Sequence, residues 1–223
     1  GGSGRSSKLP WLALGLAWLL AVLALLGPSW QRVEQSNQKP ADPLVVLLEL
    51  TPQMLATDGR PNRLEQTRRK LLDLLEARRD AQTAIIVYAG SAHSLVPLSD
   101  DLATSRNLLE ALKPSLMPEP GRRADLAVAR ALQLLDQAQL GQGRLLLITS
   151  ALSEEERSGI QQALQKHSVP LLILGVGSRE GAPVAQEDGS FLKDSRGAIL
   201  IPRLDARGLQ ETAENHGGRY ASM

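Results

Sequence analysis

Side chains suited to catalysis or metal binding are few and scattered along the chain. His93, His167 and His216 are its three histidines, and no two of them have the spacing of a zinc-binding pair. His167 and His216 fall at the ends of predicted helices, where we expect them to interact with backbone carbonyls. The chain contains no cysteine, which excludes a disulfide scaffold, a Cys-ligated zinc site and a thiol nucleophile.

Motifs for nucleophilic catalysis and for phosphate binding are lacking. A Ser-His-Asp triad can be assembled on paper from Ser91, His93 and Asp100, but no G-x-S-x-G elbow accompanies it. The chain has neither a G-x-x-x-x-G-K-[ST] loop nor a G-x-G-x-x-G turn after its first predicted strand. The sequence offers no matched nucleophile, acid and base, so we predict that the chain is not an enzyme.

Charge and aromatic content argue against nucleic-acid binding. The 223 residues carry 25 basic and 24 acidic side chains, a formal net charge of +1. Three of the few aromatic residues are tryptophans within the first thirty positions, so the rest of the chain offers few platforms for base stacking. The apolar share of 43% is enough to bury a core in one domain of ordinary size.

Polar side chains gather at the ends of short apolar runs. Such runs are typical of strands that are covered on both faces of a parallel sheet, and they occur at 43–50, 83–90, 143–150 and 170–177. In an open sheet of this kind, the ligand crevice lies outside the carboxyl ends of the strands. Glu49, Thr51 and Gln53 lie at the end of the first run. Ser150 ends the third run, and the loop at 117–125 belongs to the same edge.

Helical periodicity between these runs completes an α/β pattern. Apolar residues recur at helical spacing over 62–79, 102–112, 124–140, 154–167 and 205–215. Ser153 and Glu156 form the sequence signature of a capping box at the start of the fourth helix. The order of elements predicts a doubly wound, mostly parallel sheet flanked by helices.

Two further pieces of the sheet depart from this alternation. The run at 92–98 follows its neighbour too closely for a crossover helix, so we expect an antiparallel edge strand there. Turn signals at 188–189 and 194–197 predict a β-hairpin insertion at about 178–203. Residues 219–221 begin a final strand, and we expect the polypeptide to be part of a longer one.

Residues 9–30 predict a transmembrane helix. No charged side chain occurs from Leu9 to Gln31, and the run at 11–26 is continuously apolar, close to the length that crosses a bilayer. A cleaved signal peptide is the alternative, because basic residues precede the span and small residues follow it.

The segments around the span complete the predicted domain organisation. Residues 1–8 are a basic N-terminal flank or a cloning remnant, and residues 31–43 are polar and form a linker. A domain at 44–223 follows. Basic residues before the span place the N-terminus in the cytoplasm and this domain outside it.

The stretch from Leu44 through Tyr220 resembles a von Willebrand factor type A (VWA) domain. It resembles more closely the membrane-anchored bacterial Bat or aerotolerance proteins, the BatB-like branch in particular. The matching stretches are PNRLEQTRRKLLDLLEARRD, PLSDD, LMPEPG, GRLLLIT, GVGSREGAP, DGSFLKD and HGGRYA, with the apolar span WLALGLAWLL upstream.

This resemblance carries expectations about fold, location and partners. It implies a mainly parallel sheet flanked by helices, with partner binding at the carboxyl-end face. It also implies a complex with other VWA-domain proteins and a MoxR-type AAA+ ATPase, in envelope or stress-related protein maturation. The location that follows is the bacterial inner (cytoplasmic) membrane, with the soluble domain in the periplasm.

The usual site of that family is a metal-ion-dependent adhesion site, and each of its positions is altered here. The family builds it from D-x-S-x-S after the first strand, a Thr or Ser before the third helix, and an Asp after the fourth strand. The corresponding residues in this sequence are Glu49, Thr51, Gln53, Arg122 or Arg123, and Ser150.

These substitutions predict a crevice without a divalent metal and a chain without a cofactor. Mg²⁺ demands near-ideal octahedral oxygen ligands. Glu49 and Thr51 remain as possible ligands, but Gln53 is a weak neutral one and Arg122 brings a positive charge. Mg²⁺ binding at the remnant residues Glu49 and Thr51 is the minor alternative. Arg122 can instead pair with Glu49 or meet an acidic partner through a charge-assisted hydrogen bond.

Two classes of function remain. The first is a membrane-tethered interaction module without chemistry of its own, for which the crevice at Glu49, Thr51, Gln53, Arg122, Arg123 and Ser150 is the partner-binding site. The second is a divalent-metal-dependent binding or hydrolytic protein that uses the same crevice. In either class membrane lipid is an expected partner through the N-terminal helix, and nucleic acid is not.

Overall fold

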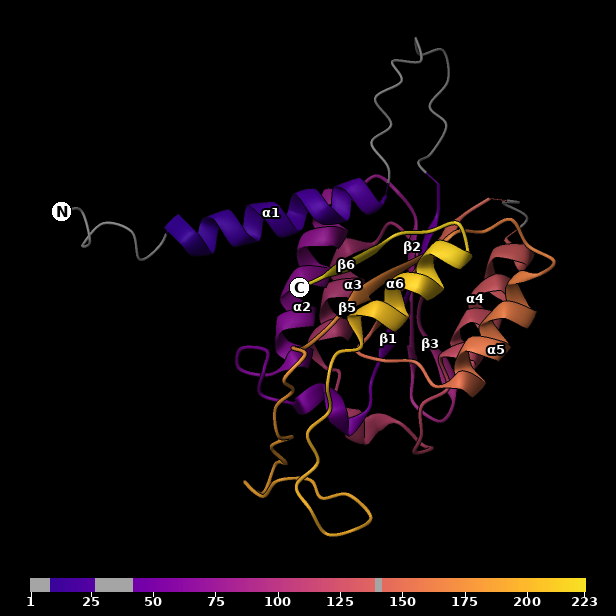
Figure 1. The fold of residues 1–223 in the computed structure, drawn as a ribbon. Helices are drawn as coiled ribbons and strands as arrows, with labels where there is room; N and C mark the ends of the chain where they lie inside the picture. The colour runs from indigo at the N-terminus through magenta and orange to yellow at the C-terminus, as the bar shows by residue number, and fades with distance from the viewer. Residues whose placement is uncertain (1–8, 27–41, 139–141) are drawn as a thin grey trace, which may run out of the picture.

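The computed structural model describes residues 9–26, 42–138 and 142–223. The predicted flank at 1–8, the end of the 9–30 span and nearly all of the linker at 31–43 lie outside these described residues. The described chain forms an α/β domain, with the helix α1 lying across its upper side in Figure 1.

A six-stranded sheet forms the centre of the domain, with the strand order β3-β2-β1-β4-β5-β6. Its members are β1 (Leu44–Glu49), β2 (Thr83–Tyr88), β3 (Ala92–Ser99), β4 (Arg144–Thr149), β5 (Leu171–Gly175) and β6 (Tyr220–Ser222). Neighbouring strands run parallel except for the β2–β3 pair, which is antiparallel. The predicted central strands and the antiparallel edge strand are therefore confirmed.

Helices flank both faces of this sheet, which confirms the doubly wound α/β prediction. They are α2 (Arg63–Ala77), α3 (Leu102–Glu110), α4 (Ala124–Gln137), α5 (Glu154–Leu164) and α6 (Ala206–Asn215). Two short 3₁₀ helices, η1 (Pro52–Leu55) and η2 (Pro114–Leu116), lie in loops at the carboxyl-end edge.

Alternating side chains of the strands divide the interior into two apolar cores. On β1, Val46 and Leu48 belong to the core shared with α2 and α3. Val45 and Leu47 belong to the core shared with α4, α5 and α6. All four are essentially inaccessible to solvent. Both faces of β1 are thus buried, which is why its sequence is almost purely apolar.

Polar caps define where several helices begin. The predicted capping box of α5 is present, with Ser153 accepting the Glu156 N–H and Glu156 accepting the Ser153 N–H. Side chains also cap α2, α3 and α6, and these caps are Asn62, Asp101 and Asp205.

The N-terminal helix α1 (Leu9–Leu25) is apolar all round and packs with one side on the domain. Trp18, Val22 and Leu25 are buried against the core of α2 and α3. The side turned away from the domain leaves Leu12, Leu16, Leu20 and Leu23 exposed, and Trp11 and Leu14 are exposed in the N-terminal half of the helix. Among the described residues, no helix combines the length and the apolarity required to span a membrane.

The insertion at 178–203 differs from the regular hairpin predicted from the sequence. Its turns lie where expected, near 186–190 and 194–198. Its antiparallel pairing, however, consists of isolated bridges, two within the insertion and one joining Val184 to Ala56. The segment therefore pairs with itself and with the stretch after η1, and it adds no strand to the main sheet.

Candidate functional site

Three side chains at neighbouring strand ends lie in a row on one side of the sheet. In the parallel register, Glu49 of β1 pairs with Tyr88 of β2. Leu48 pairs with Ile148 of β4, which places Glu49 beside Thr149. Because side chains alternate along a strand, these three side chains point to the side covered by α4 and α5. All three are buried.

Both carboxylate oxygens of Glu49 accept hydrogen bonds. Thr51 Oγ1 donates to Oε2, and Thr149 Oγ1 donates to Oε1, each at 2.8 Å. Arg122 Nη2 donates to Oε1 at 3.1 Å and to the Ala151 carbonyl oxygen at 2.6 Å. The side chain of Glu49 is 1% exposed and that of Arg122 is 27% exposed, so the pair is buried on one side and open on the other.

Backbone contacts between two loops place Arg122 above Glu49. The N–H of Arg123 donates to the carbonyl oxygen of Ala89 at 2.8 Å, which ties the loop before α4 to the end of β2. A Cβ on Gly90 would overlap the carbonyl oxygen of Pro120, so this close approach requires glycine.

Burial and charge together set the protonation of this cluster. Burial alone would lower the pKa of Arg122, but the nearby Glu49, Tyr88 and Glu156, together with the hydrogen bond to Glu49, outweigh it and raise the pKa, so the guanidinium stays protonated. Burial, reinforced by Glu49 and Glu156, raises the pKa of Tyr88 well above its ordinary value. Burial also raises the pKa of Glu156, whose carboxylate accepts the Ala124 N–H at 2.8 Å.

The neighbouring Arg123 binds a different carboxylate. Its Nε and Nη2 donate to the two oxygens of Asp125 at 3.0 and 2.9 Å, and its Nη1 lies 3.8 Å from Glu155. The sequence left Arg122 and Arg123 open as the residue at the altered loop position. The geometry distinguishes them, because Arg122 is the one that reaches Glu49.

Two other residues of the predicted crevice stand outside the Glu49 network. Gln53 is half-buried in η1, and Ser150 is buried at the end of β4. Within the described part of the chain, the Ser150 hydroxyl has no hydrogen-bond partner. The role of the crevice residues in partner binding stays a prediction.

The sequence reasoning missed Thr149 as a ligand of Glu49. The family pattern directs attention to Ser150, but strand alternation turns residue 149 toward the α4 side and residue 150 away from it. Strand periodicity was thus the signal that could have found Thr149. No local sequence pattern predicts the hydrogen bond between Glu156 and the N-terminus of α4, because this bond joins two different helices.

The residues present do not fit the divalent metal that the fold family implies. Both oxygens of Glu49 already accept hydrogen bonds, and the Arg122 guanidinium lies 3.1 Å from one of them. Octahedral coordination of Mg²⁺ at about 2.1 Å would require these oxygens to turn away from their donors. Across the described residues, no cluster of three or more His, Asp or Glu side chains could hold a metal ion.

The remaining candidates for chemistry do not assemble into a site. Ser91 Oγ lies 2.7 Å from His93 Nε2, but the pair is exposed, and no hydrogen bond joins Asp100 to His93 in the described structure. His167 Nδ1 lies 3.2 Å from the Ala163 carbonyl oxygen, as expected for a histidine at a helix end.

Known proteins resemble this chain in sequence and in fold. The family model described as von Willebrand factor type A domain matches residues 44–153. A conserved hypothetical protein BatB from Bacteroides thetaiotaomicron has a crystal structure with a TM-score of 0.74 and 27% sequence identity. The match covers 82% of this chain and 90% of that one.

Two further proteins are similar to this chain. An aerotolerance-related membrane protein from Bacteroides fragilis has a crystal structure with a TM-score of 0.74 and 26% identity, covering 82% of this chain and 91% of that one. An uncharacterized protein of Borreliella burgdorferi is 22% identical over 216 residues, which is 94% of this chain. The chain spans 62% of the length of that curated relative.

The sheet order, the Glu49–Arg122 pair at the carboxyl ends of the strands and these likenesses point to one conclusion. The chain contains a von Willebrand factor type A domain that closely resembles the BatB and aerotolerance-related membrane protein structures.

Proposed function

We propose that the protein is a membrane-tethered protein-interaction module that binds its partners at the carboxyl-end crevice without chemistry of its own. The observation that carries this proposal is the partly buried Glu49–Arg122 ion pair, at the position where the resemblance to VWA domains implies a divalent cation. In the proposed mode of binding, the cation is a fixed guanidinium supplied by the chain itself.

Arg122 has the geometry to meet an acidic side chain of a partner. Its Nη2 is held by Glu49 and Ala151 on the buried side, whereas 27% of the side chain is exposed. A guanidinium offers five N–H donors in a planar fork, so donors remain for a second carboxylate. The raised pKa of Arg122 keeps this charge in place at neutral pH.

The N-terminal helix is the proposed membrane attachment. Its exposed apolar side is unusual for a helix in contact with water, and the related Bacteroides fragilis structure is described as a membrane protein. We place the protein at the bacterial inner membrane with the domain in the periplasm, following the charges that flank the span. Its proposed partners are other VWA-domain proteins and a MoxR-type AAA+ ATPase, as the resemblance to Bat proteins implies.

Affinity capture from detergent-solubilised bacterial membranes tests the proposal. The variant Arg122→Gln combined with Glu49→Gln removes the guanidinium without leaving a buried charge unpaired. We expect the wild-type chain to capture a defined set of proteins in EDTA and to lose them in high salt. The double variant is expected to capture none of them, while Arg130→Ala, an exposed change on α4, captures all.

Two outcomes would count against the proposal. Capture that requires Mg²⁺ or Mn²⁺ and disappears in EDTA would support the metal-dependent alternative. Capture that the double variant retains in full would show that the crevice takes no part.

A further inference from the structure

The insertion at 178–203 folds on itself into a small projecting unit. Leu192 donates its N–H to the Val184 carbonyl oxygen at 3.0 Å, and the Leu200 N–H donates to the Leu192 carbonyl oxygen at 2.8 Å. Tight turns at 186–190 and 194–198 connect these three segments. In Figure 1 the unit projects from the lower end of the domain, beyond the carboxyl ends of the strands.

A buried ion pair holds the base of the insertion. Arg63 Nε and Nη2 donate to the two carboxylate oxygens of Asp58 at 2.6 and 2.8 Å, and both side chains are almost fully buried. Arg63 Nη2 also donates to the Pro202 carbonyl oxygen at 2.6 Å. Asp58 Oδ2 accepts the Ser178 N–H at 2.9 Å. One ion pair therefore contacts both ends of the insertion, and we refer to Asp58 and Arg63 as the clasp.

Gly177 lies against Arg63 of the clasp, and the space between them is too small for a side chain at position 177. Gly177 has φ of +99°, and a Cβ there would lie 2.5 Å from Arg63 Cζ. The Leu204 N–H also donates to the Ser178 carbonyl oxygen at 2.8 Å, which closes the base of the insertion. These contacts fix the orientation of the insertion relative to the domain, so less conformational entropy is lost when a partner binds it.

Three large apolar side chains are exposed on this unit. Phe191, the single phenylalanine of the sequence, is 44% exposed, and Ile199 and Ile201 are 49% and 45% exposed. A folded unit that shows several large apolar side chains to solvent is a common feature of interaction sites. An exposed aromatic side chain on a rigid support is a typical anchor of such a site.

Placement and charge indicate a protein rather than a lipid as the occupant. The insertion projects from the lower end of the molecule in Figure 1, and α1, the proposed membrane attachment, lies across the upper side. The segment carries four basic and four acidic side chains and so has no net charge. A segment that binds anionic lipid needs an excess of Lys and Arg.

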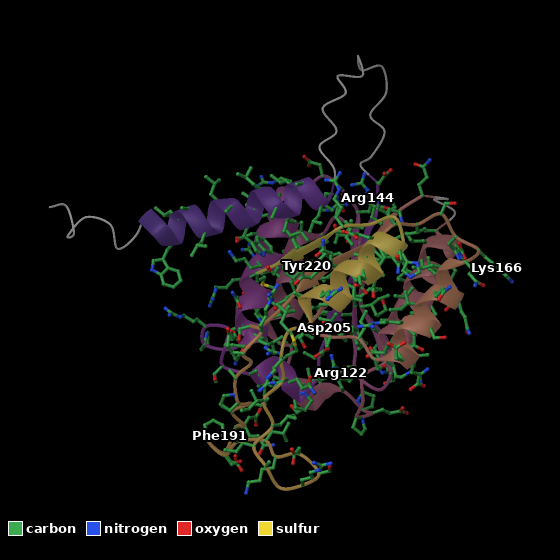
Figure 2. All side chains as sticks on the ribbon, in the orientation of Figure 1. Arg122, Arg144, Lys166, Phe191, Asp205 and Tyr220 are labelled. Carbon is green, nitrogen blue, oxygen red and sulfur yellow. The ribbon has the colours of Figure 1, made fainter. Side chains whose placement is uncertain are left out.

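We propose that the insertion is a second partner-contact element, which binds an apolar surface on the same partner protein whose acidic side chain meets Arg122. Figure 2 shows Arg122 and Phe191 toward the same end of the molecule, with Arg144 at the opposite end. The inference rests on the proposed function and extends it. The partner surface has a defined chemistry, with an acidic side chain beside exposed apolar ones.

Site-specific photocrosslinking in the full chain tests this contact. A photoreactive phenylalanine analogue replaces Phe191 or Ile199 in the membranes of the native bacterium, and Gln161 on α5 is the exposed control position. We expect the same protein to be crosslinked at 191 and 199 and not at 161. That protein is then identified, purified and titrated against detergent-solubilised wild-type chain.

The titration decides the outcome. Phe191→Ser combined with Ile199→Ser is expected to weaken binding by about tenfold or more while leaving thermal unfolding unchanged. Crosslinks to lipid alone, equal labelling at 161, or unchanged affinity of the double serine variant would overturn the inference. If the serine variant binds normally while the Glu49→Gln, Arg122→Gln variant does not, the insertion is excluded and the proposed function still stands.

Discussion

At the residue scale, Arg122 pairs with Glu49 at the position where the resemblance to VWA domains implies a bound cation. A buried carboxylate is costly unless it is paired and hydrogen-bonded. Glu49 accepts bonds from Thr51, Thr149 and Arg122, and no water is required to satisfy it. The same pairing occupies the carboxylate, so under the proposed function partner binding at this site is independent of metal supply.

Removal of Arg122 alone is expected to destabilise the fold. Arg122→Ala leaves the Glu49 carboxylate buried without its countercharge, and breaking such a pair costs about 3–5 kcal/mol. Because 27% of the arginine side chain is exposed, water can partly replace it, and we expect the lower end, about 3 kcal/mol. Urea unfolding of the detergent-solubilised chain measures this change.

The double variant supplies the control for that loss. Glu49→Gln with Arg122→Gln removes both charges, so its free energy of unfolding is expected to lie closer to that of the wild type than the single variant does. Arg130→Ala, an exposed change on α4, is expected to remain within about 0.5 kcal/mol. A single variant as stable as the wild type would show that the pair contributes nothing to folding.

Sequence reasoning identified both residues of the ion pair, Glu49 and Arg122, but not every hydrogen-bond donor to Glu49. Glu49, Thr51 and Arg122 were identified because they occupy the positions of a known motif. Thr149 was missed because the motif points to the following residue, Ser150. The choice between them depends on which face of β4 each side chain occupies, and that follows from strand alternation rather than from residue type.

At the element scale, the regular strands and helices and the turns of the insertion were predictable, and the contacts that hold the base of the insertion were not. Strands buried on both faces must be apolar at nearly every position, so their sequences are recognisable without a template. The insertion is held by the clasp, and Arg63 reaches the Pro202 carbonyl from a distant part of the chain. No local sequence pattern predicts a contact between residues so far apart in the chain. The sequence therefore indicated the turns of the insertion but not the clasp that holds its base.

Neutralisation of the clasp is expected to loosen the insertion selectively. Asp58→Asn removes the charge that binds Arg63 and weakens the acceptor of the Ser178 N–H. Hydrogen–deuterium exchange is expected to rise at 178–203, while the amides of β1 and β4 remain protected. Exposed Glu187→Gln, within the same insertion, is the matched control. Increased exchange throughout the sheet would instead indicate that the clasp supports the whole fold.

The clasp also gives the insertion a predicted pH dependence. Burial alone would raise the pKa of Asp58, but hydrogen bonds from Arg63 and Ser178 and the charge of Arg63 outweigh it and lower the pKa below the ordinary value of 3.8. A carboxyl group whose pKa is lower in the folded state stabilises that state above the ordinary pKa. This stabilisation is lost as the pH falls from 3.8 through the folded-state pKa.

We therefore expect exchange at 178–203 to rise below pH 3.8, after correction for the intrinsic pH dependence of exchange. In Asp58→Asn the same segment is expected to exchange rapidly at neutral pH, with no further change on acidification. A wild-type insertion that stays protected well below pH 3.8 would contradict the assignment of Asp58 as the titrating group.

At the scale of the whole molecule, the proposed membrane attachment and the proposed partner-binding residues lie at different ends. In Figure 1, α1 crosses the upper side of the domain and the insertion lies toward the lower end, and Figure 2 shows Arg122 toward that same end. On α1 itself, the side packed on the domain and the exposed apolar side carry different residues. This separation makes it possible to change the proposed membrane contact without disturbing the fold.

Replacing the exposed side of α1 is expected to release the protein from the membrane while preserving partner binding. Leu12, Leu16 and Leu20 are 68%, 58% and 56% exposed and share one side of the helix, whereas Trp18 and Val22 pack on the domain. A lysine at the centre of a membrane helix costs about 2.5–3.5 kcal/mol. The Leu→Lys change at all three positions is therefore expected to shift the chain from the membrane fraction to the soluble fraction.

The thermal unfolding of this triple variant is expected to match the wild type, because its substitutions leave the packed side of α1 intact. A charge-matched control carries Gln→Lys at the exposed positions 161 and 162 of α5 and at its C-cap, position 165, and it is expected to stay in the membrane fraction. The released triple variant should bind the purified crosslinked partner as tightly as the wild type, because the crevice and the insertion lie at the other end of the domain. Loss of partner binding together with membrane release would mean that the two ends are coupled, and that the bilayer itself orients the crevice toward its partner.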